Sequence, residues 1–262
     1  MIFRLDSAPV TFTIETDNLA RRYGRRWALS GVTLQIPAAT VVMLTGRNGA
    51  GKSTLLRVLA TAIRPDRGTA TVGGFDVVKH REDVRKLTAL LAHQNYLYDS
   101  LTARENLAVV ADHLRVSRAR VLPLLEQVGL GARADDVVST FSAGMRKRLS
   151  FARVLLQEPR VVLLDEPYGA LDPPGFDLVD SVIAELKASG ATIVMASHQW
   201  ERAASFCDLS VMLEQGKVWN AGVPPAEQGA SSLPSPDGAS EHRGGTPPAQ
   251  PAGTPAFRSS PC

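Results

Sequence analysis

The residues with the clearest chemical meaning run from Gly46 to Ser53 and follow the pattern G-x-x-x-x-G-K-S. Glycines at this spacing let successive backbone N–H groups point at an anion, and a helix that begins near Lys52 adds the positive end of its dipole. The Lys52 ammonium would reach the β- and γ-phosphates of a nucleotide, and the Ser53 hydroxyl would bind Mg²⁺. The alternative is a simple glycine-rich turn, but the apolar segments on both sides, 41–44 and 54–62, are those that a phosphate-binding loop requires.

Two adjacent carboxylates, Asp165 and Glu166, follow the apolar segment 161–164. Parallel α/β sheets bind ligands at the carboxyl ends of their strands, so these side chains are predicted to lie beside the phosphate-binding loop. Asp165 would hold Mg²⁺, and Glu166 would polarise the water that attacks the γ-phosphate. The alternative is a solvated pair that leads into a turn at Pro167, and the presence of a phosphate-binding loop in the same chain argues against it.

Three polar residues elsewhere in the chain indicate a particular class of P-loop ATPase: Gln94, Ser142 and His198. Gln94 follows the apolar segment 87–92, where its amide could reach Mg²⁺ and the attacking water. His198 follows the apolar segment 192–196, where its imidazole could bind the γ-phosphate, and Ser142 is placed as the N-cap of an amphipathic helix. Taken singly, each has a simpler explanation: Gln94 as a loop residue, His198 as a strand-end residue and Ser142 as an ordinary helix cap. Their order and spacing favour the functional interpretation.

Alternating strand and helix patterns predict an α/β fold that positions these residues. Five apolar segments separated by helical patterns are typical of a parallel sheet covered on both faces: 40–44, 87–92, 160–164, 192–196 and 209–213. The residues before the loop resemble a short antiparallel hairpin, as does the segment 68–78 with its Gly73-Gly74 turn. Between Leu101 and Gln157 the pattern is almost entirely helical, which predicts a helical insertion into the core.

Composition predicts one domain in a reducing compartment. The chain has 262 residues, of which 44% are hydrophobic and 21% charged, enough for one full core and a small subdomain. No apolar run approaches the 18 or so residues of a membrane span, and the first residues do not resemble a signal peptide, so we expect a cytoplasmic protein. Two cysteines give no disulfide framework. The net charge of +3 is too small to indicate nucleic acid, and no nucleic-acid partner is expected.

The composition changes abruptly near Gly222, and nine of the seventeen prolines lie between this residue and Cys262. A segment with so few apolar clusters cannot bury enough surface to offset the entropy of its ordering. The sequence therefore predicts a folded domain over 1–221 and a disordered Pro/Gly/Ser-rich tail over 222–262. Its P-x-x-P spacings leave a ligand motif as an alternative to a flexible extension.

Together these motifs resemble the nucleotide-binding subunit of an ATP-binding cassette (ABC) transporter, from Leu19 to about Val218. The resemblance implies a P-loop NTPase fold with a RecA-like parallel-sheet core, an antiparallel β subdomain and a helical signature subdomain at about 100–157. It identifies Glu166, His198 and Gln94 as catalytic. It places Ser53, Gln94 and Asp165 around Mg²⁺. It assigns contacts with ATP to Tyr23, Gly46, Asn48, Gly49, Ala50, Gly51, Lys52, Ser53, Thr54, Ser142, Gly144 and Asp172.

The resemblance also gives some of these residues specific roles. Tyr23 matches the aromatic ring that stacks on adenine, Gln94 the Q-loop, Asp172 the D-loop and His198 the switch histidine. The signature usually reads L-S-G-G-Q in this family, whereas residues 141–145 here read F-S-A-G-M. Ser142 and Gly144, which touch the γ-phosphate across a dimer, are retained.

Partners follow from the same resemblance. Two cassettes face each other head to tail and trap two ATP molecules, each between the phosphate-binding loop of one cassette and Ser142 and Gly144 of the other. ATP binds the closed dimer better than the open one, and this difference drives an attached protein. An integral membrane transporter subunit is therefore implied, and it would hold the chain on the cytoplasmic face of the cell membrane.

The segment 91–107, the Asp165-Glu166-Pro167-Tyr168 run and the signature are similar to the ATP-binding subunit of the haem exporter of cytochrome c biogenesis. The alternatives are the ATPase of a drug or lipid exporter, or a soluble ABC ATPase such as an iron–sulfur assembly factor. Apolar and aromatic residues after Gln94, at 96–98 and Leu101, favour a groove for a helix of a membrane subunit over plain subdomain core.

Overall fold

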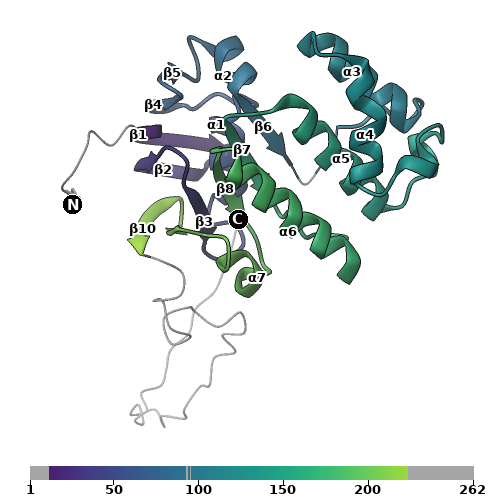
Figure 1. The fold of residues 1–262 in the computed structure, drawn as a ribbon. Helices are drawn as coiled ribbons and strands as arrows, with labels where there is room; N and C mark the ends of the chain where they lie inside the picture. The colour runs from purple at the N-terminus through teal and green to yellow at the C-terminus, as the bar shows by residue number, and fades with distance from the viewer. Residues whose placement is uncertain (1–11, 93, 95, 224–262) are drawn as a thin grey trace, which may run out of the picture.

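Two β-sheets and a set of helices make up the fold, which a computed structural model describes for residues 12–92, 94 and 96–223 (Figure 1). The antiparallel sheet has the strand order β2-β1-β4-β5, and the mainly parallel sheet has the order β10-β9-β3-β8-β7-β6. The predicted parallel-sheet core, antiparallel β subdomain and helical subdomain are confirmed.

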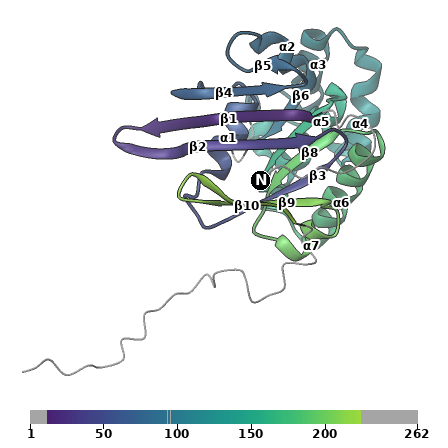
Figure 2. The same ribbon diagram turned by 90° about the vertical axis from the view of Figure 1, so that its left-hand side faces the viewer.

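The antiparallel sheet contains two long strands, which extend to one side in Figure 2. Burial alternates along the second of them because successive side chains point to opposite faces. Gly73 and Gly74 form the second predicted turn, and both have positive φ angles, of 59° and 81°. The strands are β1 (Phe12–Tyr23), β2 (Arg26–Pro37), β4 (Arg67–Val72) and β5 (Phe75–Asp76).

The parallel strands are short, and every residue of β7 and β8 is buried. Their continuous apolar sequences are typical of strands covered by helices on both faces. The strands are β3 (Val41–Thr45), β6 (Thr88–Leu91), β7 (Val161–Asp165), β8 (Thr192–Ala196) and β9 (Leu209–Glu214), with β10 (Lys217–Val223) antiparallel at the edge.

Two hydrophobic cores lie on opposite faces of this sheet. Val41 and Met43 of β3 belong to the core with the helical subdomain, whereas Val42 and Leu44 belong to the core with the antiparallel sheet. The alternation follows from the two-residue period of a strand. Four helices lie outside the helical subdomain: α1 (Lys52–Leu59), α2 (Arg81–Leu87), α6 (Pro173–Ala188) and α7 (Trp200–Ala204).

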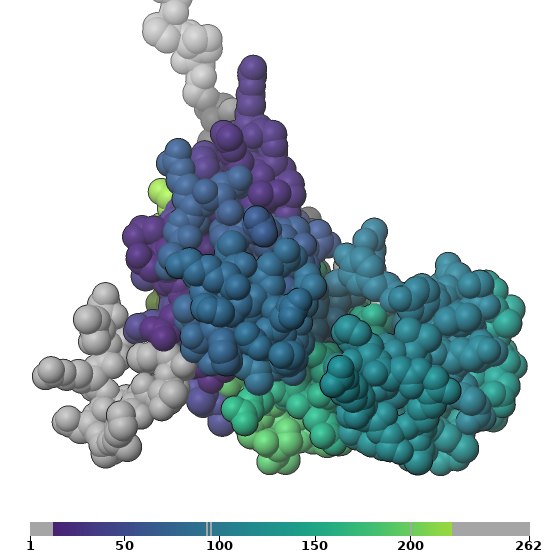
Figure 3. Space-filling view, turned by 90° about the horizontal axis from the view of Figure 1, so that it is seen from above, coloured from purple at the N-terminus to yellow at the C-terminus, as the bar shows by residue number. Residues whose placement is uncertain are grey.

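The helical subdomain forms a lobe beside the β-rich part of the molecule (Figure 3). Thr102 begins its first helix with a capping box, because its side chain accepts the N–H of Glu105 while the Glu105 carboxylate accepts the N–H of Thr102. Three helices and three 3₁₀ turns build the lobe: α3 (Ala103–Leu114), η1 (Arg118–Arg120), α4 (Val121–Gln127), η2 (Gly131–Arg133), η3 (Val138–Thr140) and α5 (Ala143–Gln157).

Two boundaries differ from those expected. The helix predicted to reach residue 62 ends at Leu59, because the backbone turns to a left-handed φ of 59° at Thr61. Strand β10 continues to Val223, two residues past the expected end of the folded domain at 221. The predicted tail beyond it, 224–262, lies outside the described residues. None of the helices in the described ranges combines the length and the apolar character that crossing a membrane requires.

Candidate functional site

The phosphate-binding loop joins β3 to α1 and depends on glycine at two positions. The φ angles of Gly46 and Gly51 are 128° and 110°, a region that side chains disfavour. A Cβ atom at Gly46 would lie 2.1 Å from the carbonyl oxygen of Leu213, and one at Gly51 would lie 2.4 Å from that of Ala28. Glycine is therefore required because the backbone of neighbouring strands approaches the loop closely.

Lys52, the first residue of α1, spans the loop. Its Nζ atom donates to the carbonyl oxygens of Gly46, at 2.6 Å, and Arg47, at 3.3 Å. Burial lowers the pKa of Lys52, whereas the charges of Glu166 and Asp165 act to raise it. The first turn of α1 contains no acidic residue, so its free N–H groups and the ammonium favour an anion in the loop.

Ser53 connects the loop to β7. Its hydroxyl donates to Oδ1 of Asp165 at 2.9 Å, so two of the three predicted Mg²⁺ residues are in contact, and Gln94 is not among them. A hydroxyl and a carboxylate are the oxygen ligands that Mg²⁺ accepts, together with water and phosphate oxygens. Within the described residues, no group of three or more His, Cys, Asp or Glu side chains has an arrangement that could hold a metal ion by itself.

Glu166 follows β7 and faces His198, which follows the adjacent strand β8. The backbone N–H of His198 donates to Oε2 of Glu166 at 3.1 Å, and its Nε2 atom lies 3.5 Å from Oε1. Glu166 has a φ angle of 52°, which is unusual for a residue other than glycine. This turn, and the N–H of Glu166 bonded to the carbonyl of Ala196 at 2.8 Å, hold its carboxylate beside His198.

A cavity of about 520 Å³ brings most of the predicted residues together. It lies where β1, β2, the phosphate-binding loop and the ends of β7 and β8 meet. Its lining consists of Tyr23, Arg26, Ala28, Asn48, Gly49, Ala50, Gly51, Lys52, Ser53, Thr54, Arg57, Asp165, Glu166 and His198. Gly46 contributes through its carbonyl oxygen, which binds Lys52. A volume of this size is typical of small-molecule sites.

The sequence patterns did not predict three basic residues at this site. Arg57 lies one helical turn after Ser53, so the helical period was a usable signal. Arg26 follows Tyr23 by three residues in the β1–β2 hairpin, and only the register of these strands brings it to the loop. Lys147 of α5 is 5% exposed, and burial lowers its pKa to about 8 against the opposing charges of Asp165 and Glu166.

Apart from Gly46, four predicted site residues lie outside the cavity. Gln94 is exposed at a bend, between two positions outside the described residues, and its catalytic role remains a prediction. Ser142 is the N-cap of α5, as predicted, and its Oγ accepts the N–H of Met145 at 3.2 Å. Asp172 caps α6 by accepting the N–H of Gly175 at 3.1 Å. Ser142 and Gly144 are left accessible, as an approach by a second molecule requires.

Comparison with known proteins gives consistent matches. The family model described as ABC transporter matches residues 29–169. The lantibiotic transport ATP-binding protein SrtF of Streptococcus pyogenes is 35% identical over 205 residues, which cover 78% of this chain and 88% of that protein. The daunorubicin resistance ATP-binding protein DrrA3 of Streptomyces coeruleorubidus is 38% identical over 209 residues, or 78% of this chain and 66% of that protein.

The chain is also similar to a solved structure of a dimer. It is the dimeric, post-hydrolysis state of an ATP-binding cassette bound to ADP and Pi, with a TM-score of 0.73 and 25% identity. The match covers 79% of this chain and 97% of that one. The two named relatives serve lantibiotic transport and daunorubicin resistance, so they give no support to the haem exporter that the sequence indicated.

Proposed function

This chain belongs to the ABC transporter family, and from that membership we propose that it binds and hydrolyses ATP to power a separate membrane subunit that exports a small molecule. The observation that supports hydrolysis is one cavity that contains Lys52, the bonded pair Ser53 and Asp165, and Glu166. The named relatives, a lantibiotic transport protein and a daunorubicin resistance protein, support an antibiotic-like cargo.

Each group in the cavity has a defined part in hydrolysis. The loop N–H groups and Lys52 bind and orient the phosphates, and Glu166 accepts a proton from the attacking water. His198, whose Nε2 lies 3.5 Å from Oε1 of Glu166, would donate a hydrogen bond to the γ-phosphate. When bound, Mg²⁺ neutralises charge that develops on the phosphate oxygens, and Ser53 and Asp165 have the donor atoms to hold it.

A second copy of the chain completes the site in this proposal. Ser142 and Gly144 do not line the cavity of their own chain, and both remain accessible on the helical lobe. A head-to-tail dimer would bring them to the γ-phosphate bound by the partner. The related cassette, which is dimeric with bound ADP and Pi, supports a dimer.

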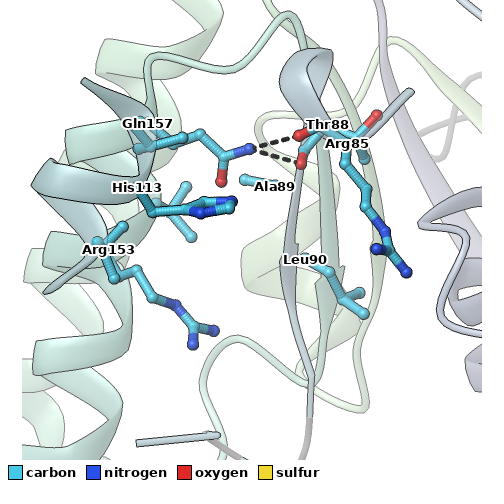
Figure 4. A pocket seen from close by; sticks show the side chains of 10 residues that line it. Arg85, Thr88, Ala89, Leu90, His113, Arg153 and Gln157 are labelled. Atoms are coloured by element: carbon cyan, nitrogen blue, oxygen red, sulfur yellow. Dashed lines mark hydrogen bonds between the residues drawn. The ribbon is translucent and has the colours of Figure 1, made fainter. Parts of the chain in front are cut away.

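The surface for the membrane subunit is proposed at a second cavity, of about 280 Å³, between β6, α3 and α5 (Figure 4). His113 and Arg153 extend from the two helices toward β6, and none of the described residues that line this groove is acidic. Burial lowers the pKa of Arg153, whose Nη1 donates to the carbonyl of Tyr96 at 3.3 Å. An acidic side chain from the membrane subunit would compensate this charge.

The residues after Gln94 contribute to this surface only in part. Tyr96 and Tyr98 are 62% and 58% exposed, as a docking surface requires. Leu97, predicted to lie in the same groove, is partly buried and packs against the core of the helical subdomain. This contact supports the alternative of subdomain core for Leu97. Held by its partner, the chain would act at the cytoplasmic face of the cell membrane.

The remaining hypotheses differ in the molecule that is transported, and the phenotype of a strain that lacks this gene tests them. Export of an antibiotic-like or lipid-like molecule predicts increased sensitivity to members of a panel of lantibiotics and anthracyclines, restored by wild type and not by Glu166→Gln. Haem export predicts instead a loss of covalently bound haem in cytochrome c. Normal resistance together with normal cytochrome c would contradict both and favour a soluble ABC ATPase.

A further inference from the structure

Tyr168 lies two residues after Glu166 and is 2% exposed, yet its hydroxyl has a charged partner. Its Oη donates to Oδ1 of Asp180, on α6, at 2.7 Å. Burial first, and then this hydrogen bond and the carboxylate charge, raise the pKa of Tyr168 well above its ordinary value. The hydroxyl therefore keeps its proton and remains a donor to Asp180.

Arg202 reaches the same carboxylate from a different segment. It belongs to α7, four residues after His198, and its Nε donates to Oδ2 of Asp180 at 2.6 Å. It also pairs with Asp177, one turn earlier on α6. Asp180 therefore binds the segment that follows Glu166 with one oxygen and the segment that follows His198 with the other.

Phe176 of α6 packs against both partners of Asp180. Its ring meets the Tyr168 ring edge to face at 5.7 Å, and the Arg202 guanidinium lies 5.5 Å from its centroid. Charge-assisted hydrogen bonds are stronger than neutral ones, and aromatic contacts fix side-chain direction. These contacts hold the side chains of Tyr168 and Arg202 against the same helix, α6.

Helix α7 has little stability of its own. It contains five residues, and no side chain caps its N-terminus. Helices shorter than about 12 residues are marginal without tertiary contacts. The position of α7, and of His198 just before it, thus depends on contacts such as those of Arg202.

From this geometry we infer that Tyr168, Asp180 and Arg202 form a clamp that fixes the Glu166 carboxylate against His198 during hydrolysis. All three are positioning residues, because none lines the nucleotide cavity. The inference rests on the proposed ATPase function. A shift of about 1 Å in a catalytic group can cost about 100-fold in rate, so a mobile Glu166 would hydrolyse poorly.

The first test removes only the hydroxyl, with Tyr168→Phe in the full chain. We expect kcat for ATP to fall about 10-fold, as for other supporting hydrogen bonds, while KM stays within about twofold. Arg202→Gln should have a similar effect, and it serves if Tyr168→Phe fails to fold. The matched control is Arg104→Gln, which breaks an exposed pair with Asp135 on the helical lobe and should leave kcat unchanged.

A double-mutant cycle separates positioning from general loosening. Combined with Glu166→Gln, Tyr168→Phe should change the single-turnover rate less than twofold, because the carboxylate that the clamp positions is gone. An equal loss with and without the Glu166 carboxylate would overturn the inference. So would a Tyr168→Phe variant whose kcat equals that of wild type.

Amide hydrogen exchange without nucleotide tests the clamp independently of hydrolysis. The backbone amides of 197–204, where the Ala203 N–H donates to the Gln199 carbonyl, should exchange faster in both clamp variants than in wild type. In Arg104→Gln their exchange rate should be unchanged. Unchanged exchange would reject the clamp even in an active ATPase. A wild-type chain without hydrolysis would instead reject the proposed function, with the exchange result still deciding whether the clamp exists.

Discussion

The hydroxyl of Ser53 donates to the carboxylate of Asp165 at 2.9 Å, although 112 positions separate the two residues in the sequence. The bond joins the start of α1 to the end of β7. It places two oxygen atoms suited to Mg²⁺ beside Lys52, which binds the loop carbonyls. The loop and the residues proposed to hold Mg²⁺ and to activate water therefore lie together in the fold, and preorganised groups need little rearrangement during a reaction.

The Ser53–Asp165 pair predicts a metal-dependent defect. Ser53→Ala should lower Mg²⁺-dependent ATP hydrolysis about 10- to 100-fold, because it removes one of the two oxygen ligands. The loss should be partly recovered at high Mg²⁺ concentration. Phosphate release measured across a Mg²⁺ titration checks this, with Ser189→Ala, whose hydroxyl binds the Leu186 carbonyl, as control. Equal activity at every Mg²⁺ concentration would remove Ser53 from the metal site.

The head-to-tail dimer predicts complementation between two inactive chains. Lys52→Ala disables the phosphate-binding loop, and Ser142→Arg disables the surface offered to the partner's nucleotide. Each variant alone should lose most hydrolysis. In a mixture, half of the dimers are mixed, and each mixed dimer contains one site with both residues intact, so activity should return. A mixture as inactive as its components would contradict the shared site.

Lys147 predicts an unusual dependence of stability on pH. Its pKa in the folded chain is about 8, against 10.5 for an exposed lysine, so burying the charged form costs about 3 kcal/mol below pH 8. As pH rises from 8 to 10.5 the unfolded chain holds the extra proton, and this cost disappears. Lys147→Met should therefore raise the free energy of unfolding by up to about 3 kcal/mol at pH 7, and by less as pH approaches 10.5.

Denaturant unfolding of wild type and Lys147→Met at several pH values measures this difference. A gain that does not shrink with pH would mean that burial does not lower the pKa of Lys147. A loss of stability in Lys147→Met would mean that the charges of Asp165 and Glu166 stabilise the ammonium more than burial penalises it.

The sequence predicted the parts of this site that depend on one chain segment. The glycines of the loop, Lys52, Asp165 and Glu166 have local patterns, and parallel strands place their carboxyl ends at one edge. Lys147 and Arg26 reach the site only through tertiary packing, for which no local pattern exists. Leu97, predicted from its neighbours to line a groove, is partly buried and packs against the core of the helical subdomain, a contact that only the tertiary fold determines.

The groove beside β6 predicts a charge-dependent partner. Arg153→Glu should leave ATP binding within about twofold, because Arg153 lies outside the nucleotide cavity, and should abolish retention on membranes that contain the transporter subunit. Membrane retention of the tagged chain, with Arg118→Glu as an exposed control on the same lobe, measures the effect. Retention equal to that of wild type would place the membrane contact elsewhere.

ATP hydrolysis by Glu166→Gln tests the central claim most directly. Glutamine keeps the size of the side chain and leaves Lys52, Ser53 and Asp165 intact, but it cannot accept a proton from water. The initial rate of phosphate release should fall about 10²- to 10⁴-fold. ATP affinity should stay within a few-fold of wild type, and size-exclusion chromatography should show an ATP-dependent dimer. The control Glu185→Gln, on the exposed face of α6, should hydrolyse ATP at the wild-type rate. A Glu166→Gln variant with wild-type turnover would contradict the account.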